Sequence, residues 1–207
     1  MSDIDAGALI VGGHVLTVFD SESRPQWRRD CALVVRDGNI VEIGPSSELQ
    51  RLYPSLPVSG GPGFVVMPGM VNAHHHVGIT PFQLGSADYP LELWLGSRLA
   101  LRDVDLELDT LYSAMEMVSS GVTTVQHLHS RAPGNAAQVL EAADHVISAY
   151  HRLGMRASYS MAVRDQNRIV YGSDADFTSR VAPHLRASLK EYFDRFTLPL
   201  IEQMGIF

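Results

Sequence analysis

The first third of the chain alternates short apolar runs with polar turns, a pattern that is typical of β-strands. The apolar runs between residues 8 and 43 are residues 8–11, 14–19, 31–35 and 40–43. Between the last two, the sequence Arg36-Asp37-Gly38-Asn39 predicts a tight hairpin turn. The glycine- and proline-rich stretch at residues 57–63 predicts a boundary. We therefore expect a first, all-β domain over residues 1–63.

From residue 64 to residue 207, apolar runs and helical stripes follow one another in turn. One stripe has an apolar residue at every third or fourth position and consists of Val104, Leu108, Leu111, Met115 and Val118. A second stripe runs from Ala136 to Tyr150, and Gly121 and Gly154 follow the two stripes as helix stops. Strands are predicted over residues 122–128 and 155–163, and a third helix over residues 189–200. Strands that alternate with helices favour an α/β fold with a parallel sheet.

Three consecutive histidines stand out in the segment that precedes the first stripe. His74, His75 and His76 follow the apolar run of residues 64–67 and the dipeptide Pro68-Gly69. Neighbouring side chains of a strand point to opposite faces, so His74 and His76 share one face and His75 points to the other. Two imidazoles in this arrangement are able to bind one metal ion. A polar patch at a strand end is the alternative interpretation.

Several segments resemble the amidohydrolase superfamily, in particular the branch of cytosine, guanine and 8-oxoguanine deaminases and triazine hydrolases. The resemblance is carried by VMPGMVNAHHHVG at residues 66–78, PLELWL at residues 90–95 and GVTTV at residues 121–125. It implies a (β/α)8 TIM barrel, of which residues 64–207 would supply the first three βα units. Residues 1–63 would be the N-terminal half of a small β-sandwich. A complete barrel takes roughly 250 residues, so we expect the chain to be the front portion of a longer protein.

The resemblance also implies a chemistry. His74 and His76 match the two metal ligands of the family's first barrel strand, and zinc is the expected ion, with iron as the alternative. The implied reaction is metal-dependent hydrolysis of a carbon–nitrogen bond of a cyclic substrate, with deamination of a nitrogen heterocycle preferred over other leaving groups. No residue of this portion matches the family's proton-transferring or later ligating residues. The alternative is therefore an inactive fragment that binds metal weakly.

Four further residues are candidates for contact with the substrate. His127 and His129 lie two positions apart at the end of the second strand and share one face. From the end of that strand they could touch the substrate or support a ligand. Gln83 and Trp94, in the segment after the first strand, could hydrogen-bond to and stack on a flat heterocycle, and packing within a loop is the alternative for both.

The composition argues against several other classes of protein. The net charge is −7 and no cluster of lysine and arginine is present, which argues against binding to nucleic acid. No apolar stretch approaches the roughly 20 residues of a membrane-spanning helix. The single cysteine, Cys31, fits a reducing compartment. We expect a cytoplasmic protein with a small heterocyclic substrate, whose intact form could be a homo-oligomer.

Overall fold

A computed structural model describes residues 7–76, 89–91, 93, 94, 97, 104–129, 135–162 and 172–195. The chain divides into two compact units, Met1–Pro68 and Gly69–Phe207, which are described separately below. None of the helices in the described part of the chain combines the length and the apolar character that a membrane span requires.

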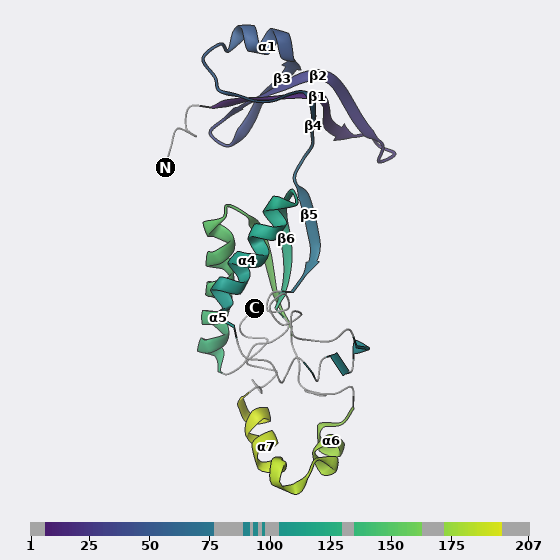
Figure 1. The fold of residues 1–207 in the computed structure, drawn as a ribbon, viewed down its shortest axis with the longest axis vertical. Coiled ribbons are helices and arrows are strands. Elements are labelled where there is room, and N and C mark those ends of the chain that lie inside the picture. Colours follow the sequence, from purple (N-terminus) through teal and green to yellow (C-terminus); the bar gives the residue numbers. More distant parts are fainter. Residues whose placement is uncertain are drawn as a thin grey trace. The chain divides into compact units, whose positions relative to one another are not determined.

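The first unit is built on one four-stranded sheet. Its elements are β1 (Ala8–Phe19), β2 (Pro25–Arg36), β3 (Asn39–Pro45), the helix α1 (Ser46–Leu52) and β4 (Val58–Val66). The strand order is β3-β2-β1-β4, with β4 parallel to β1 and the other neighbours antiparallel (Figure 1). The predicted hairpin turn is confirmed, because Arg36 pairs with Asn39 and both Asp37 and Gly38 have positive φ.

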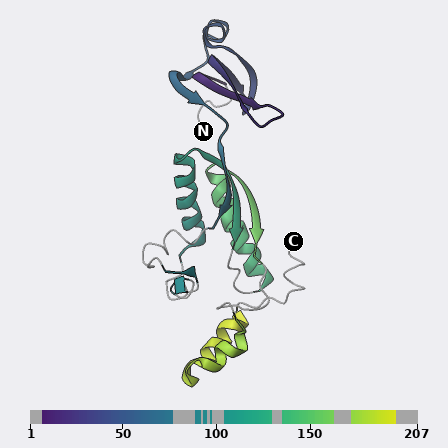
Figure 2. The same ribbon diagram turned by 90° about the vertical axis from the view of Figure 1, so that its right-hand side faces the viewer.

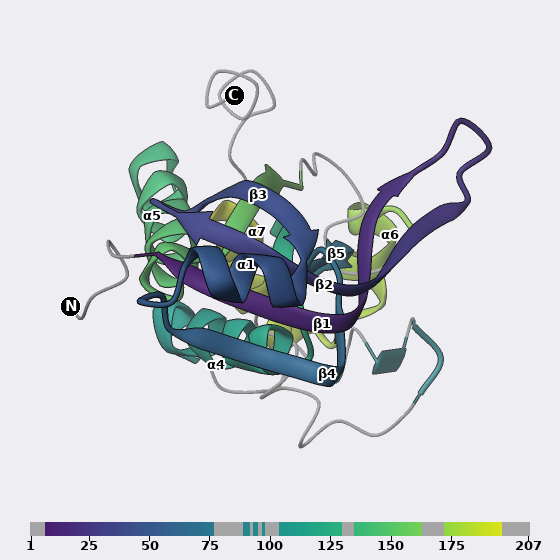
Figure 3. The same cartoon turned by 90° about the horizontal axis from the view of Figure 1, so that it is seen from above.

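The helix α1 lies across one face of this sheet (Figure 3). Its buried residue Leu49 packs on alternate apolar side chains of β1 and β2, namely Leu9, Val11, Ala32 and Val34. A second apolar cluster contains Val15, Cys31 and Leu33. The described residues of this unit form a single sheet, so the β-sandwich remains a prediction.

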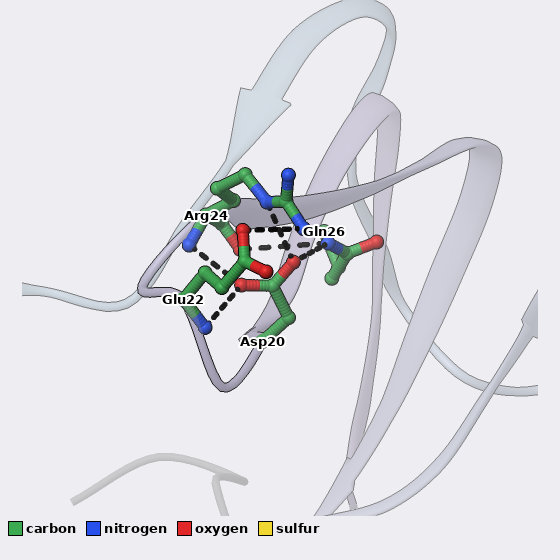
Figure 4. Close-up of polar contacts among 4 residues, drawn as sticks. All are labelled: Asp20, Glu22, Arg24 and Gln26. Atoms are coloured by element: carbon green, nitrogen blue, oxygen red, sulfur yellow. Dashed lines mark hydrogen bonds and ion pairs between the residues drawn. The ribbon is translucent and has the colours of Figure 1, made fainter.

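The turn between β1 and β2 is organised by one carboxylate (Figure 4). Oδ1 of Asp20 accepts hydrogen bonds from the backbone N–H groups of Glu22 and Arg24, each at 2.9 Å. Oδ2 accepts from Arg24 Nε and Gln26 Nε2, each at 3.1 Å. The backbone donor of Arg24 contributes most to holding the pKa of Asp20 below its usual value.

Residues 57–63, which we expected to form a boundary, instead belong largely to β4. A glycine in this strand allows its backbone to pack closely against that of β1. Gly60 has a φ of +86°, and a Cβ there would lie 2.2 Å from the carbonyl oxygen of Val11. The same strand includes residues 64–66, which we expected at the start of the histidine strand, and the division between the units falls after Pro68.

The second unit contains a parallel three-stranded sheet of order β5-β6-β7 (Figure 2). Its elements are β5 (Met70–His75), α4 (Leu106–Ser119), β6 (Val122–His129), α5 (Ala136–Arg152) and β7 (Arg156–Met161). The predicted order of parallel strands with helical crossovers is confirmed. The chain continues as α6 (Asp174–Arg180), a short 3₁₀ helix, η2 (Pro183–Leu185), and α7 (Arg186–Arg195).

The two crossover helices begin and end where the sequence predicts. Asp105 caps α4 by accepting a hydrogen bond from Leu108 N, and Asn135 forms a capping box with Gln138 at the start of α5. Gly121 and Gly154 follow the helices with φ of +84° and +69°. These left-handed positions favour glycine, which explains the helix stops.

The core of this unit lies between the helices and one face of the sheet. Its buried members are Ala114, Met117, Val125, Val146, Tyr150 and Met155. The apolar stripe that identified α4 does not supply the buried face of that helix, because Leu108 and Met115 are 62% and 60% exposed. Ser113, Ala114 and Met117 are buried instead, and Ala114 and Met117 belong to the core. The helix was predicted correctly, but its buried face was not.

Candidate metal centre

The histidine strand starts against the beginning of β6. The backbone N–H of Met70 donates to the carbonyl of Gly121 at 2.9 Å. A Cβ at Gly69 would lie 2.1 Å from Oγ1 of Thr123, so only glycine allows the chain to pass this close. The close approach fixes where β5 enters the sheet.

The pairing of β5 with β6 contains two irregularities that cancel. β6 has one extra residue between the pairs Met70–Val122 and Val71–Thr124, and β5 has one extra residue before the pair His75–His127. In the irregular segment, Asn72 donates through Nδ2 to Sδ of Met117 at 3.5 Å and accepts the backbone N–H of His74 at 3.2 Å. The side chain of Asn72 thus connects the strand to α4 and holds the backbone beside His74.

His74 and His76 bring their rings together at the end of this strand. Their Nε2 atoms lie 3.0 Å apart and the ring centroids 4.8 Å apart, with the ring planes nearly perpendicular. His75 lies between them in sequence but pairs with the buried His127 of β6, and its Nε2 is buried without a hydrogen-bond partner among the described residues. The strand therefore separates the two neighbouring rings from that of His75.

The surroundings of His76 suit a metal ligand. Its Nδ1 lies 2.7 Å from the carbonyl oxygen of Leu128, which is an acceptor only, so Nδ1 carries the proton and donates. This tautomer leaves the lone pair on Nε2, the atom that faces His74. Two nitrogen ligands of a tetrahedral zinc ion lie about 3.3–3.4 Å apart, close to the observed separation. The pair therefore fits a divalent ion that prefers imidazole.

The described part of the chain offers no group of three or more histidine, cysteine, aspartate or glutamate side chains placed to hold a metal. The two histidines of β5 are thus the ligands that this part of the chain would contribute. An ion bound only by them would keep several positions open to water or substrate.

His127 and His129, the candidates for touching the substrate or supporting a ligand, lie in a buried cluster. His127 is fully buried and His129 is 7% exposed. Nδ1 of His127 lies 3.1 Å from the hydroxyl of Tyr150 on α5, and its Nε2 lies 3.3 Å from Nδ1 of His129. Tyr159 of β7 stacks on both imidazole rings. Their face of β6 is the one that packs on the helices, so this arrangement does not support contact with substrate.

Burial dominates the ionisation of this cluster. Desolvation, followed by the charges of neighbouring histidines, lowers the pKa of His127 to about 3. Desolvation likewise raises the pKa of Tyr150 and that of Tyr159. His127 and the two tyrosines are therefore neutral near pH 7.

The folded protein should lose stability on acidification because of His127. Its pKa is lower in the folded state, about 3, than the value near 6.5 expected after unfolding, so the unfolded chain takes up the proton first. The contribution is complete above pH ~6.5 and should fall by about 2 kcal/mol between pH 6.5 and 5. Urea unfolding at a series of pH values measures the slope of the free energy of unfolding against pH. His127→Gln should flatten it, and an unchanged slope in that variant would refute the assignment.

The remaining sequence candidates give little support to a substrate site. Gln83 lies outside the described residues. Trp94 is half-buried, its backbone N–H donates to the carbonyl of Pro90, and its carbonyl accepts from Ser97 Oγ. Sequence reasoning missed the carbonyl of Leu128, because a backbone group leaves no side-chain signal. It placed Tyr150 on the apolar stripe of α5 but not beside His127.

Comparison with known proteins gives consistent similarities. A family model described as "Amidohydrolase family" matches residues 65–199. The 5-methylthioadenosine/S-adenosylhomocysteine deaminase of Pelotomaculum thermopropionicum is 27% identical over 188 residues, which cover 86% of this chain and 43% of that protein. The enzyme of the same name from Desulforudis audaxviator is 30% identical over 155 residues, covering 72% of this chain and 32% of that protein. The chain thus spans less than half the length of these curated relatives.

Two solved structures share the fold. Atrazine chlorohydrolase TrzN from Arthrobacter aurescens TC1, complexed with zinc, has a TM-score of 0.56 at 21% identity and covers 93% of this chain and 44% of its own. An adenosine deaminase from Xanthomonas campestris with bound zinc has a TM-score of 0.51 at 22% identity, covering 90% of this chain and 39% of its own. At these identities the likeness concerns the fold alone.

Proposed function

The chain belongs to the amidohydrolase family, and from this premise we propose that it forms the N-terminal part of a metal-dependent hydrolase of carbon–nitrogen bonds. The strands β5, β6 and β7 would be the first three of a (β/α)8 barrel, and the first unit would be part of a small β-sandwich beside it. In a barrel of this kind, the C-terminal ends of the strands form the active site, and the histidine pair lies at that end of β5.

One observation carries the proposal: the Nε2 atoms of His74 and His76 converge to 3.0 Å, while the Leu128 carbonyl holds His76 in the tautomer that leaves Nε2 unprotonated. These two imidazoles would hold a divalent ion, zinc rather than iron because zinc favours nitrogen ligands in an open tetrahedral site. When bound, the ion would supply water activated for attack near neutral pH.

The reaction that we propose is deamination of a nitrogen heterocycle. Water adds its oxygen to the ring carbon that bears the amino group, the carbon–nitrogen bond breaks, and ammonia leaves. Two of the relatives are named as 5-methylthioadenosine/S-adenosylhomocysteine deaminases, which makes adenine nucleosides with a thioether the first substrates to test. Loss of chloride from a triazine is the competing reaction, because atrazine chlorohydrolase shares the fold.

A second candidate is a chain that binds metal without turnover. It is favoured by the fact that the described residues supply a pair of ligands rather than a group of three. For the active protein, we propose a homo-oligomeric state and a cytoplasmic location, the location being in line with the single cysteine.

A direct assay separates these candidates. The purified chain, loaded with zinc, iron(II) or manganese, is incubated with 5-methylthioadenosine, S-adenosylhomocysteine, guanine and atrazine, and released ammonia and chloride are measured. Metal-dependent ammonia release that disappears in His74→Ala would establish the deaminase. Chloride release would favour the competing hydrolase. Stoichiometric metal binding with no product would show that this portion by itself binds metal without turnover, and the absence of metal binding would refute both candidates.

A further inference from the structure

The carbonyl oxygen of Leu128 occupies a special place in the sheet. It points towards β5, where it accepts the hydrogen bond from Nδ1 of His76 at 2.7 Å. The next carbonyl along β6, that of His129, points to the other side and accepts from the backbone N–H of Ala162 at 2.8 Å. The last described pair between β5 and β6 is His75–His127. Leu128 is the next residue of β6 after this pair, and its carbonyl accepts from the imidazole of His76. The orientation of this one peptide group therefore decides which nitrogen of His76 carries the proton.

The two residues that flank Leu128 have both their rings buried on the helix side of β6. The His127 ring lies between Tyr150 and Tyr159: the centroid distance to Tyr159 is 5.2 Å with an angle of 7° between the planes. The His129 ring also stacks on Tyr159, at 5.6 Å. Because both neighbours of Leu128 are held in this way, its peptide group is unable to rotate unless the buried rings move.

Two short contacts connect Tyr150 with His127 and His127 with His129. A buried hydroxyl needs an acceptor for its proton, and the hydrogen-bond partner that the structure gives the Tyr150 hydroxyl is Nδ1 of His127, at 3.1 Å. The buried carboxylate of Asp109 also acts on Tyr150 through its charge. If Tyr150 donates to Nδ1 of His127, the neutral ring of His127 carries its proton on Nε2 and donates in turn to Nδ1 of His129 at 3.3 Å. In this arrangement the hydroxyl of Tyr150 is the first donor of a chain that reaches His129, beside the peptide group bonded to His76.

We propose that Tyr150 is a positioning residue for the metal pair. Through His127 and His129, its hydroxyl holds the β6 backbone so that the Leu128 carbonyl keeps His76 protonated at Nδ1 and its Nε2 directed towards His74. The inference rests on the proposed function in so far as His74 and His76 bind the ion. It adds a residue on α5 that no motif of the sequence connects with a metal.

The structure offers a matched pair of variants to test this role. Tyr150→Phe removes the first donor and keeps the ring. Tyr159→Phe also removes a buried hydroxyl, but that hydroxyl has no hydrogen-bond partner among the described residues, and the stacked ring remains. Both variants are measured as the full 207-residue chain. Zinc affinity is determined by competition with a chromogenic chelator, and the tautomer of His76 by long-range ¹⁵N–¹H correlation spectra without metal.

We expect Tyr150→Phe to weaken zinc binding about tenfold, at the low end of the roughly 10- to 100-fold cost of losing an outer-shell partner. The same variant should show a new population of His76 protonated at Nε2. Tyr159→Phe should keep the zinc affinity and the His76 tautomer of the unchanged chain. Equal losses in the two variants would mean that only general packing matters, and would overturn the proposal.

The tautomer measurement keeps this inference separate from the proposed function. If the unchanged chain binds no zinc, the proposed function fails, but the spectra still report whether Tyr150 sets the tautomer. If His76 of the unchanged chain is protonated at Nε2, the positioning role is refuted without any variant, even where Tyr150→Phe fails to fold. If the tautomer shifts in Tyr150→Phe while zinc affinity stays constant, the role in metal binding is refuted.

Discussion

Replacing either His74 or His76 by alanine should abolish tight zinc binding by this chain. Each variant leaves a single imidazole at a place where the described residues supply only a pair, whose Nε2 atoms lie 3.0 Å apart. Loss of a supporting residue costs roughly 10- to 100-fold in metal affinity, so loss of a direct ligand should weaken binding by more than about 100-fold. Competition titration with a chromogenic chelator, followed by metal analysis of the dialysed protein, measures the change.

His75 provides the sharpest control, because it lies between the two ligands in sequence. His75 is the strand partner of the buried His127 and its Nε2 is itself buried, so His75→Ala should retain zinc even if it lowers stability. His184→Ala, at an exposed position of η2, should change neither zinc binding nor stability. Loss of zinc in His75→Ala together with its retention in His74→Ala would show that the strand faces are assigned the wrong way round.

Replacing Gly60 by alanine should strongly destabilise the first unit. The residue has a φ of +86°, a left-handed conformation that costs an alanine about 1–2 kcal/mol. The new Cβ would also lie 2.2 Å from the Val11 carbonyl, so β4 would have to move away from β1. Together we expect a loss of about 3 kcal/mol or more in the free energy of unfolding, measured by urea denaturation.

Gly63 is the matched control in the same strand. A Cβ added there meets no atom within 4 Å, and its φ is not in the left-handed region. Gly63→Ala should therefore leave stability unchanged or raise it by about 0.5 kcal/mol through the smaller entropy of the unfolded chain. Similar losses for the two variants would mean that β4 is not packed against β1 as described.

Much of the second unit was predictable from local patterns. The period of the apolar residues identified α4 and α5, Gly121 and Gly154 placed their C-terminal ends, and alternation along the strand separated His75 from its neighbours. These features depend on residues close in sequence. The turn at Asp37 and Gly38 was predictable for the same reason, because its two positive φ angles require particular residues.

The failures have one physical origin, which is contact between residues distant in sequence. The glycines of residues 57–63 suggested a linker, but Gly60 is required by the backbone of β1 nearly fifty residues earlier. Leu108 and Met115 suggested a buried stripe, yet α4 meets the sheet through Ala114 and Met117, which cluster with Val125 of β6. Likewise, the spacing of His127 and His129 fixed a shared face but could not say which face.

The buried cluster beneath β6 also determines how titrations of the metal centre are to be interpreted. His127 has a pKa of about 3, and burial raises the pKa of Tyr150, so neither group exchanges a proton in the range in which cells operate. His127 and Tyr150 therefore keep a constant charge between about pH 5 and 8. Neither group should release or take up a proton when zinc binds in that range. Calorimetry in buffers of different ionisation enthalpy could then count the protons released on zinc binding without a correction for these two groups.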